Sequence, residues 1–166
     1  MDNLELLRKL VDDILSRIPD QDRARNGFVH LYGVSTICNM LAVKRGLDPE
    51  LCGIAGMLHD LTNYTVGEDP NHAALSAIEA KKVLNDLQRY PRTIINRICR
   101  AVARHSDKQS VHSNMDELLK DADVLQHYLY NPNQFDIANQ RAAWQGSPEK
   151  PMRLRRLDRV MHELNM

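Results

Sequence analysis

The chain lacks an excess of charge of either sign and contains few cysteines. Its 22 Lys and Arg residues balance 22 Asp and Glu residues, so no overall field attracts a long nucleic acid, and any nucleotide must be bound locally. The three cysteines, Cys38, Cys52 and Cys99, lie in apolar helical contexts and form no CxxC pair. This number and spacing exclude the disulfide framework of a small secreted domain and predict reduced, buried thiols.

A long apolar run is also absent. No apolar stretch reaches the roughly 18 residues that a membrane-spanning helix needs. The N-terminal segment, MDNLELLRKLVDDILSRI, carries acidic residues within an amphipathic pattern, unlike the basic and then apolar layout of a signal peptide. We therefore expect a cytoplasmic protein with no membrane partner.

Helical periodicity dominates what is present. No segment shows the sustained alternation and β-branched enrichment of a strand, whereas apolar residues recur at helical spacing along most of the chain. The 166 residues have the length of one ordinary domain. We predict an all-α, single-domain helical bundle over residues 1–166, with a core at about 25–130 and C-terminal helices at about 133–165 packed on it.

Local signals set the expected helix boundaries. The predicted helices cover about residues 4–18, 25–44, 49–60, 71–88, 91–104, 115–130, 135–144 and 149–164, with an irregular loop at 61–69. Gly46 suits the end of one helix, and Asp48 with Pro49 suits the start of the next. That helix, LCGIAGMLHD, is apolar on nearly all sides and belongs at the centre of a bundle. Its last two residues, His59 and Asp60, therefore end a buried element.

Six residues along the chain could together hold one or two metal ions. Imidazole and carboxylate groups suit first-row divalent metals, and a carboxylate next to a histidine can bridge two ions. A single histidine on an apolar face is more often a core residue, but the joint pattern favours a metal site between the central helices. The candidate ligands are His30, His59, Asp60, His72, His105 and Asp123.

Four of these residues resemble the signature of the HD-domain superfamily of metal-dependent phosphohydrolases. His30 in HLYGV, the pair His59 and Asp60 in AGMLHDLTNY, and Asp123 in KDADVLQ match its order of a first His, a His-Asp pair and a final Asp, over about residues 25–130. The resemblance implies that these four residues hold one metal ion. Asp121 is the alternative to Asp123, because neighbours on a helix differ by about 100° and only one of them can face the ion.

The resemblance extends to the two-metal branch of the superfamily. His72 in DPNHAALSA and His105 in AVARHSDK fall where that branch supplies its additional histidines. They imply a dinuclear centre in which Asp60 bridges two divalent transition metal ions, drawn from Fe, Mn, Ni, Co and Zn. The alternative is that His72 caps its helix and His105 lies at a helix C-terminus, where a cation is favoured.

Cations near the signature could bind a phosphate. The candidates are Arg25, Arg104 and Lys108, of which Lys108, three residues after His105, is preferred; the alternative is a solvated loop lysine. Many superfamily members carry a catalytic Lys three residues after the His-Asp pair, where this chain has Asn63. Asn63 could orient a water or a phosphate oxygen but supplies no charge.

Two further groups have simpler interpretations. His127, four residues after Asp123, is expected to pack, or to support a ligand from behind. The arginines of the last helix alternate with apolar residues and are expected to form its wet face, in a helix that packs on the core or in a homodimer. They are Arg153, Arg155, Arg156 and Arg159.

The resemblance implies a metal-dependent phosphohydrolase that cleaves a small phosphoester or phosphoanhydride by metal-activated water. Asp60, Lys108 and Asn63 would serve catalysis, and the preferred partner is a small phosphorylated substrate such as a nucleotide. Two alternatives remain open, namely an HD-type di-iron oxygenase and a non-catalytic nucleotide-binding sensor module.

Overall fold

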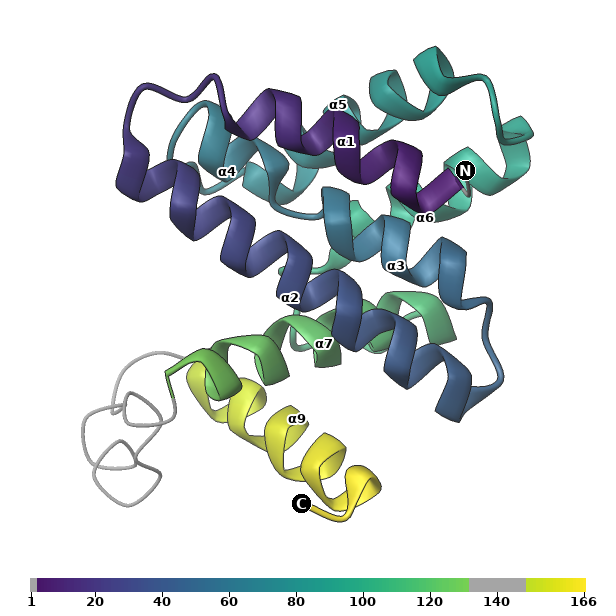
Figure 1. Ribbon diagram of the computed structural model, residues 1–166. Coiled ribbons are helices and arrows are strands. Elements are labelled where there is room, and N and C mark those ends of the chain that lie inside the picture. Colours follow the sequence, from purple (N-terminus) through teal and green to yellow (C-terminus); the bar gives the residue numbers. More distant parts are fainter. Residues whose placement is uncertain (1–2, 132–148) are drawn as a thin grey trace.

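The computed structural model describes residues 3–131 and 149–166, and every regular element in these ranges is a helix, which confirms the all-α prediction (Figure 1). In chain order the helices are α1 (Asn3–Leu15), α2 (Gln21–Arg45), α3 (Pro49–Leu58), α4 (Leu61–Thr65), α5 (His72–Leu87), α6 (Arg92–Arg104), α7 (Asn114–Tyr130) and α9 (Glu149–Leu164). The helix expected at 135–144 lies outside the described residues. None of the described helices is both long and apolar enough to cross a membrane.

Helix α3 forms the centre of the bundle. Its residues from Leu51 to Leu58 are all buried, as their apolar sequence predicts. Helix α2 packs on α3 more extensively than on any other described helix, and it also packs on α7. Close approach of α2 and α3 depends on Gly56, because an added Cβ there would lie 2.8 Å from the Cα of Ser35. This packing buries His59 and Asp60, which directly follow α3.

The ends of α2 and α3 follow the predicted signals, with one shift. Asp20 caps α2 by accepting a hydrogen bond from a backbone amide of the first turn, so the helix begins at Gln21 and not near residue 25. Gly46 ends α2 in the left-handed conformation, with φ of 65°. Asp48 caps α3, and Pro49 takes the first helical position.

A short helix stands where the sequence predicts an irregular loop. Helix α4 has only 5 residues, too few for a periodic pattern to reveal it. Its buried residues, Leu61 and Thr62, face the core, and Thr62 Oγ1 lies 2.7 Å from Ser76 Oγ of α5. Packing against α5 therefore stabilises a helix that would not persist alone.

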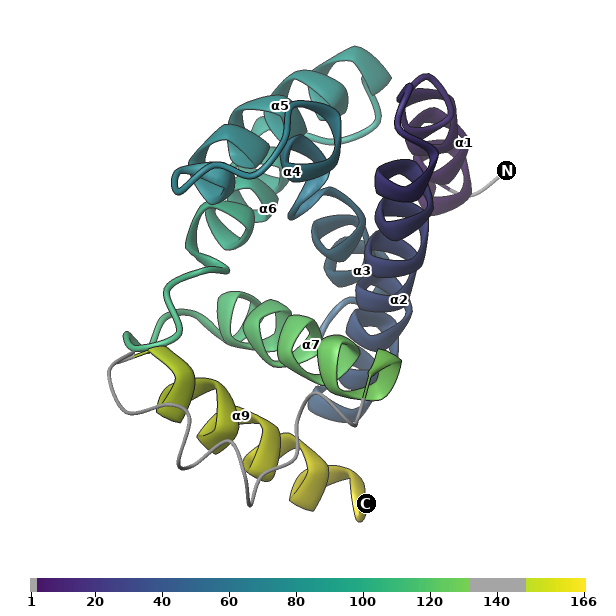
Figure 2. The ribbon, with the colours of Figure 1, turned by 90° about the vertical axis from the view of Figure 1, so that its left-hand side faces the viewer.

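Helix α9 forms an outer layer on α7, on the side of the bundle away from α4 and α5 (Figures 1 and 2). Three of its apolar residues, Leu154, Leu157 and Val160, are buried. Their spacing of three residues gives α9 one apolar stripe, which covers α7.

Candidate metal centre

Four of the predicted ligands meet at one point in the interior. His30 comes from α2, His59 and Asp60 follow α3, and Asp123 comes from α7. His30 Nε2 lies 3.1 Å from His59 Nε2, 3.6 Å from Asp60 Oδ2 and 3.5 Å from Asp123 Oδ1. Because all four are buried and lie on a helix or directly at a helix end, rigid elements fix their relative positions.

Two more histidines face the other oxygen of Asp60. Asp60 Oδ1 lies 3.1 Å from His105 Nε2 and 3.6 Å from His72 Nε2. The two oxygens of one carboxylate thus point to two separate pairs of histidines. This is the arrangement that a carboxylate bridging two ions needs, and the donor atoms of Asp60, His72 and His105 all lie within 4.8 Å of one another.

Each of these histidines is held through its other ring nitrogen. Nδ1 lies within hydrogen-bond distance of an acceptor in all four, so it carries the proton and leaves the Nε2 lone pair directed at the cluster. The acceptors are Gln126 Oε1 for His30 at 2.7 Å, Gly56 O for His59 at 2.8 Å, Asp69 O for His72 at 2.9 Å and Val102 O for His105 at 2.8 Å.

This donor set fits divalent metal ions. Nε2 atoms of His30 and His59 face each other at 3.1 Å, and both rings donate their Nδ1 proton elsewhere, so an added cation would relieve the repulsion of two lone pairs. Asp60 Oδ1 is buried and has no hydrogen-bond partner among the described residues. An unpartnered, buried carboxylate oxygen beside imidazole nitrogens suits a divalent cation.

The electrostatics of the cluster also favour a cation. Burial raises the pKa of Asp60, but the charge of His59 and the neighbouring imidazoles of His105 and His30 hold it well below its usual range. Burial lowers the pKa of His30, yet its hydrogen bond with Asp60 and the charges of Asp123 and Asp60 outweigh this and raise it. The pKa of His105 is lowered, chiefly by burial.

Asp121 and Asp123 lie on different faces of α7. Asp123 faces the histidines, whereas Asp121 is surrounded by arginines. Asp121 accepts hydrogen bonds from Arg159 Nη2 at 2.7 Å, Arg45 Nη2 at 2.9 Å and Arg156 Nη1 at 3.1 Å. Of the two aspartates, Asp123 is thus the one beside the candidate ligands, and Asp121 belongs to an ion cluster between helices.

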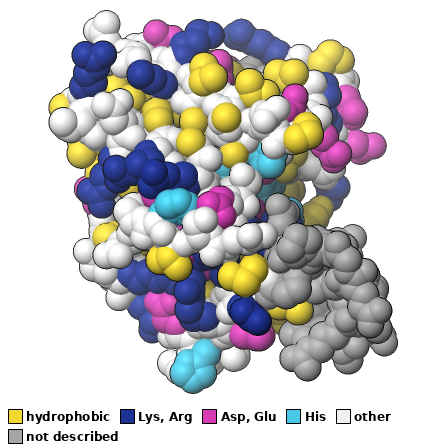
Figure 3. All heavy atoms as spheres, turned by 180° about the vertical axis from the view of Figure 1, so that it is seen from behind, with side chains coloured by type: hydrophobic (Ala, Val, Ile, Leu, Met, Phe, Trp, Pro, Cys, Tyr) yellow, Lys and Arg dark blue, Asp and Glu magenta, His cyan; other side chains and the backbone are white. Residues whose placement is uncertain are grey.

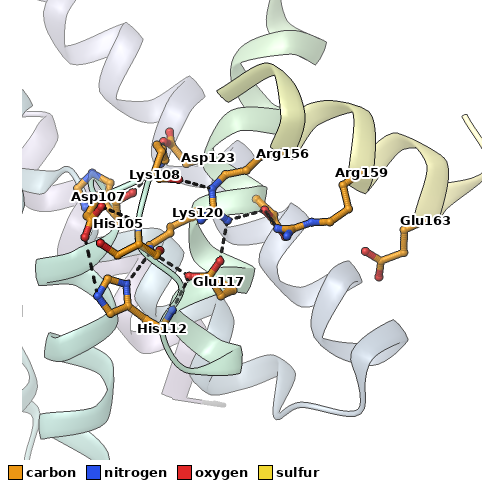
Figure 4. Close-up of polar contacts among 12 residues, drawn as sticks. His105, Asp107, Lys108, His112, Glu117, Lys120, Asp123, Arg156, Arg159 and Glu163 are labelled. Carbon is orange, nitrogen blue, oxygen red and sulfur yellow. Dashed lines mark hydrogen bonds and ion pairs between the residues drawn. The ribbon is translucent and has the colours of Figure 1, made fainter. Parts of the chain in front are cut away.

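Lys108 lies beside the candidate metal ligands and is not a solvated loop lysine. It is buried, and its Nζ donates to Asp123 Oδ2 and to His105 O, each at 2.6 Å (Figure 4). Burial lowers the pKa of Lys108, although the neighbouring carboxylate of Asp123 opposes the effect. This ion pair also contributes most to holding the pKa of Asp123 well below its usual range against the effect of burial.

Among the predicted catalytic and substrate-binding residues, three do not line the cavity beside the cluster. Arg104 is half exposed and pairs with Asp116, 3.2 Å away, because it precedes His105 on the same helix and points about 100° from it. Arg25 is exposed on α2, five residues and therefore about 140° from His30. Asn63 lies on the outer side of α4 and lines a separate surface pocket. The structure therefore does not bring these three side chains to the cavity, and their predicted roles stay predictions.

The cavity beside the cluster has a volume of about 120 Å³. It is lined by Asp60, His72, His105, Ser106, Lys108, Asp123, His127 and Arg153. On the face seen from behind, histidine side chains are exposed next to acidic and basic ones (Figure 3). Two ionised carboxylates and two cationic side chains thus share one small polar cavity.

Sequence reasoning missed Gln126 and the position of Arg153. Gln126 holds His30 and follows Asp123 by one helical turn, so periodicity could have found it. His127, expected either to pack or to support a ligand, has its Nε2 3.3 Å from Asp123 Oδ1. Arg153 Nη2 lies 3.4 Å from Asp123 Oδ2, and no local sequence pattern in α9 indicates this contact. The expectation of a wet arginine face is wrong for Arg156, which is buried, whereas Arg153 is partly exposed and lines the cavity.

Comparisons with known proteins agree with this geometry. The HD domain family model matches residues 27–128, more than half of the chain. Ribonuclease Y 1 of Levilactobacillus brevis is 28% identical over 119 residues, which are 72% of this chain but only 21% of that protein. A crystal structure described as a predicted HD superfamily hydrolase, from an uncultured Thermotogales bacterium, has a TM-score of 0.61 and 20% identity and covers 99% of this chain and 96% of its own. This crystal structure shows the same fold as the present chain. The family match shows that the chain belongs to the HD domain family.

Proposed function

We propose that this protein is a metal-dependent phosphohydrolase that cleaves a small phosphoester or phosphoanhydride, with a nucleotide as the preferred substrate. The observation that carries the proposal is the position of Asp60, whose two oxygens face two separate pairs of histidines beside a cavity with a buried lysine. The similarity to Ribonuclease Y 1 supports the type of bond, because a ribonuclease cleaves phosphodiesters.

Two sets of residues would hold metal ions. His30, His59, Asp60 and Asp123 form one set, and Asp60 with His72 and His105 forms the other. When bound, divalent ions would activate water as a nucleophile and neutralise charge on phosphoryl oxygens. The backbone carbonyls behind three of the histidines keep their rings oriented whether or not a substrate is present.

Lys108 would bind the phosphoryl group. Its ammonium has three hydrogens, and two of them are used by Asp123 and by His105 O. The third remains for a phosphoryl oxygen, since Lys108 lines the cavity. A buried positive charge at this point stabilises the charge that develops in phosphoryl transfer more strongly than a solvated one would.

The size of the cavity limits what enters it. The cavity is small and polar, so a phosphoryl group would enter it and the remainder of a nucleotide would extend toward the opening. His72 and His127 are partly exposed at this opening, with 24% and 44% of their side chains accessible. This geometry favours a substrate with an accessible phosphoryl group over one embedded in a folded polymer.

The first test is metal content, which needs no substrate. Protein purified without added metal should contain about two transition metal ions per chain by elemental analysis, and Asp60→Ala should contain none while remaining helical. Asp86→Asn, which removes an exposed carboxylate on α5, is the control and should keep the wild-type content. Wild-type metal content in Asp60→Ala would refute the proposed centre.

The second test is turnover. The loaded protein should release phosphate or a nucleotide product from a panel of mononucleotides, dinucleoside polyphosphates and a short oligoribonucleotide, with and without dioxygen. Activity that requires dioxygen and iron would favour the di-iron oxygenase instead. Nucleotide binding with no product anywhere in the panel would favour the sensor module.

A further inference from the structure

Arg153 reaches the cavity from a part of the chain that lies outside the HD domain match at residues 27–128. Its guanidinium Nη2 lies 3.4 Å from Asp123 Oδ2, and its side chain is 37% exposed. Its Nε is buried and has no hydrogen-bond partner among the described residues. A guanidinium carries five N–H donors, so most of the donor capacity of Arg153 is unused.

Neighbouring arginines on α9 hold this residue in place. One turn after Arg153, Arg156 bonds Asp121 Oδ1 at 3.1 Å and Lys108 O at 3.2 Å, and pairs with Glu117 Oε2 at 2.9 Å (Figure 4). Arg159 bonds both oxygens of Asp121. These contacts fix α9 on α7, so the position of Arg153 follows from the docking of the helix and does not depend on its own weak contact.

The ion pair with Asp123 does not account for the position of Arg153 in the cavity. Asp123 Oδ2 already accepts a hydrogen bond from Lys108 at 2.6 Å, and Arg153 approaches the same oxygen only at 3.4 Å. Arg156, by contrast, makes three close contacts with protein acceptors. Arg153 is therefore the arginine of α9 that combines a place in the cavity with unsatisfied donors.

We propose that Arg153 binds the non-bridging oxygens of a phosphoryl group opposite Lys108, so that α9 completes the substrate site. The inference rests on the proposed function and names its phosphate-binding residue. A planar guanidinium suits this task because it can donate two parallel hydrogen bonds to two phosphate oxygens, which a lysine cannot. Arg153 would exchange its long contact with Asp123 for these bonds when a phosphoryl group enters.

The experiment measures inorganic phosphate binding to metal-loaded protein by calorimetry. Arg153→Ala should weaken phosphate binding about 10-fold or more, the effect expected for losing charge-assisted hydrogen bonds. Arg153→Lys should recover only part of the affinity, since it restores charge without the two parallel donors. Arg155→Ala removes an exposed arginine of the same helix and should leave the affinity within about twofold of wild type.

Metal content and unfolding are measured on the same samples. The proposal requires that Arg153→Ala keeps its metal and an unfolding midpoint close to that of Arg155→Ala. Phosphate affinity unchanged by Arg153→Ala, or reduced only in proportion to lost metal, would overturn it. Absence of phosphate binding to the wild-type protein would overturn it as well. Phosphate binding that depends on Arg153 in a protein that hydrolyses nothing would refute the proposed function and leave the anion site standing.

Discussion

Replacing Gln126 with leucine should weaken metal binding although Gln126 touches no metal-facing atom of the cluster. Its Oε1 accepts the Nδ1 proton of His30 at 2.7 Å, and both residues are buried. Leucine has nearly the same volume, so the packing of this side chain against Gly33 should survive. What changes is that a buried N–H loses its acceptor, or that the proton moves to Nε2 and blocks the atom that faces Asp60 and Asp123.

The magnitude follows from that unpaired donor. A buried polar group without a partner costs about 1–3 kcal/mol, which corresponds to roughly 5–150-fold in an equilibrium constant. Loss of the partner behind a ligating histidine typically costs about 10–100-fold in metal affinity, so the two estimates agree. We expect Gln126→Leu to bind metal about 10–100-fold more weakly than wild type.

Competition with a chromogenic chelator measures this affinity directly on protein stripped of metal. Gln126→Glu, which keeps an acceptor for His30, should bind within about threefold of wild type or more tightly. Gln109→Leu is the control, because Gln109 is an exposed loop residue whose backbone amide makes its hydrogen bond. Equal metal affinity in Gln126→Leu and wild type would show that the orientation of His30 does not depend on this bond.

Two further predictions concern other groups of α7. Asp123→Ala should lose metal and stay folded. Asp121→Ala should keep metal but lose about 3 kcal/mol of unfolding free energy, because the arginines around Asp121 lose their buried partner. Elemental analysis and urea unfolding measure the two effects, and metal loss in Asp121→Ala alone would reverse the assignment. Burial raises the pKa of Glu117, but hydrogen bonds from Lys120, the His112 amide and Arg156 outweigh this effect and lower the pKa to about 2. The stabilising effect of the ionised Glu117 is therefore present above its ordinary pKa of 4.5 and is lost as the pH falls toward 2. Glu117→Gln should lower the unfolding free energy by about 2 kcal/mol at pH 7, allowing for partial solvent screening, and the difference from wild type should shrink between about pH 5 and 3; a difference independent of pH would contradict the pairing.

The sequence predicts the helices and the six clustered residues because both depend on local patterns. The apolar α3 segment had to lie at the centre, and it carries His59 and Asp60 with it. Asp48 and Gly46 mark helix ends through backbone hydrogen bonds that need no distant partner. Helix α4 escaped prediction because its stability comes from Ser76 and other residues of α5, which a local pattern does not contain.

Residues that line the cavity are harder to predict, because nearness in sequence does not fix nearness in space. Arg104 adjoins His105, yet one step along a helix turns the side chain by about 100° and points it to Asp116. The same arithmetic would have excluded Arg25. Arg153 lies 30 residues from Asp123, and only the packing of α9 on α7 brings them together.

The Asp-Ala-Asp run of α7 links the local sequence pattern to the packing of α9 on α7. Because two residues turn a helix by about 200°, Asp121 and Asp123 point to nearly opposite sides. Asp123 faces His30 and Lys108 in the cluster, and Asp121 binds the arginines that dock α9. Docking through Asp121 in turn carries Arg153 back around α7 to Asp123. One short motif thus supplies a donor to the metal centre and anchors the helix that brings a second cation to the same carboxylate, so we expect a substitution at either aspartate to alter phosphate binding, through metal loss at Asp123 and through displacement of α9 at Asp121.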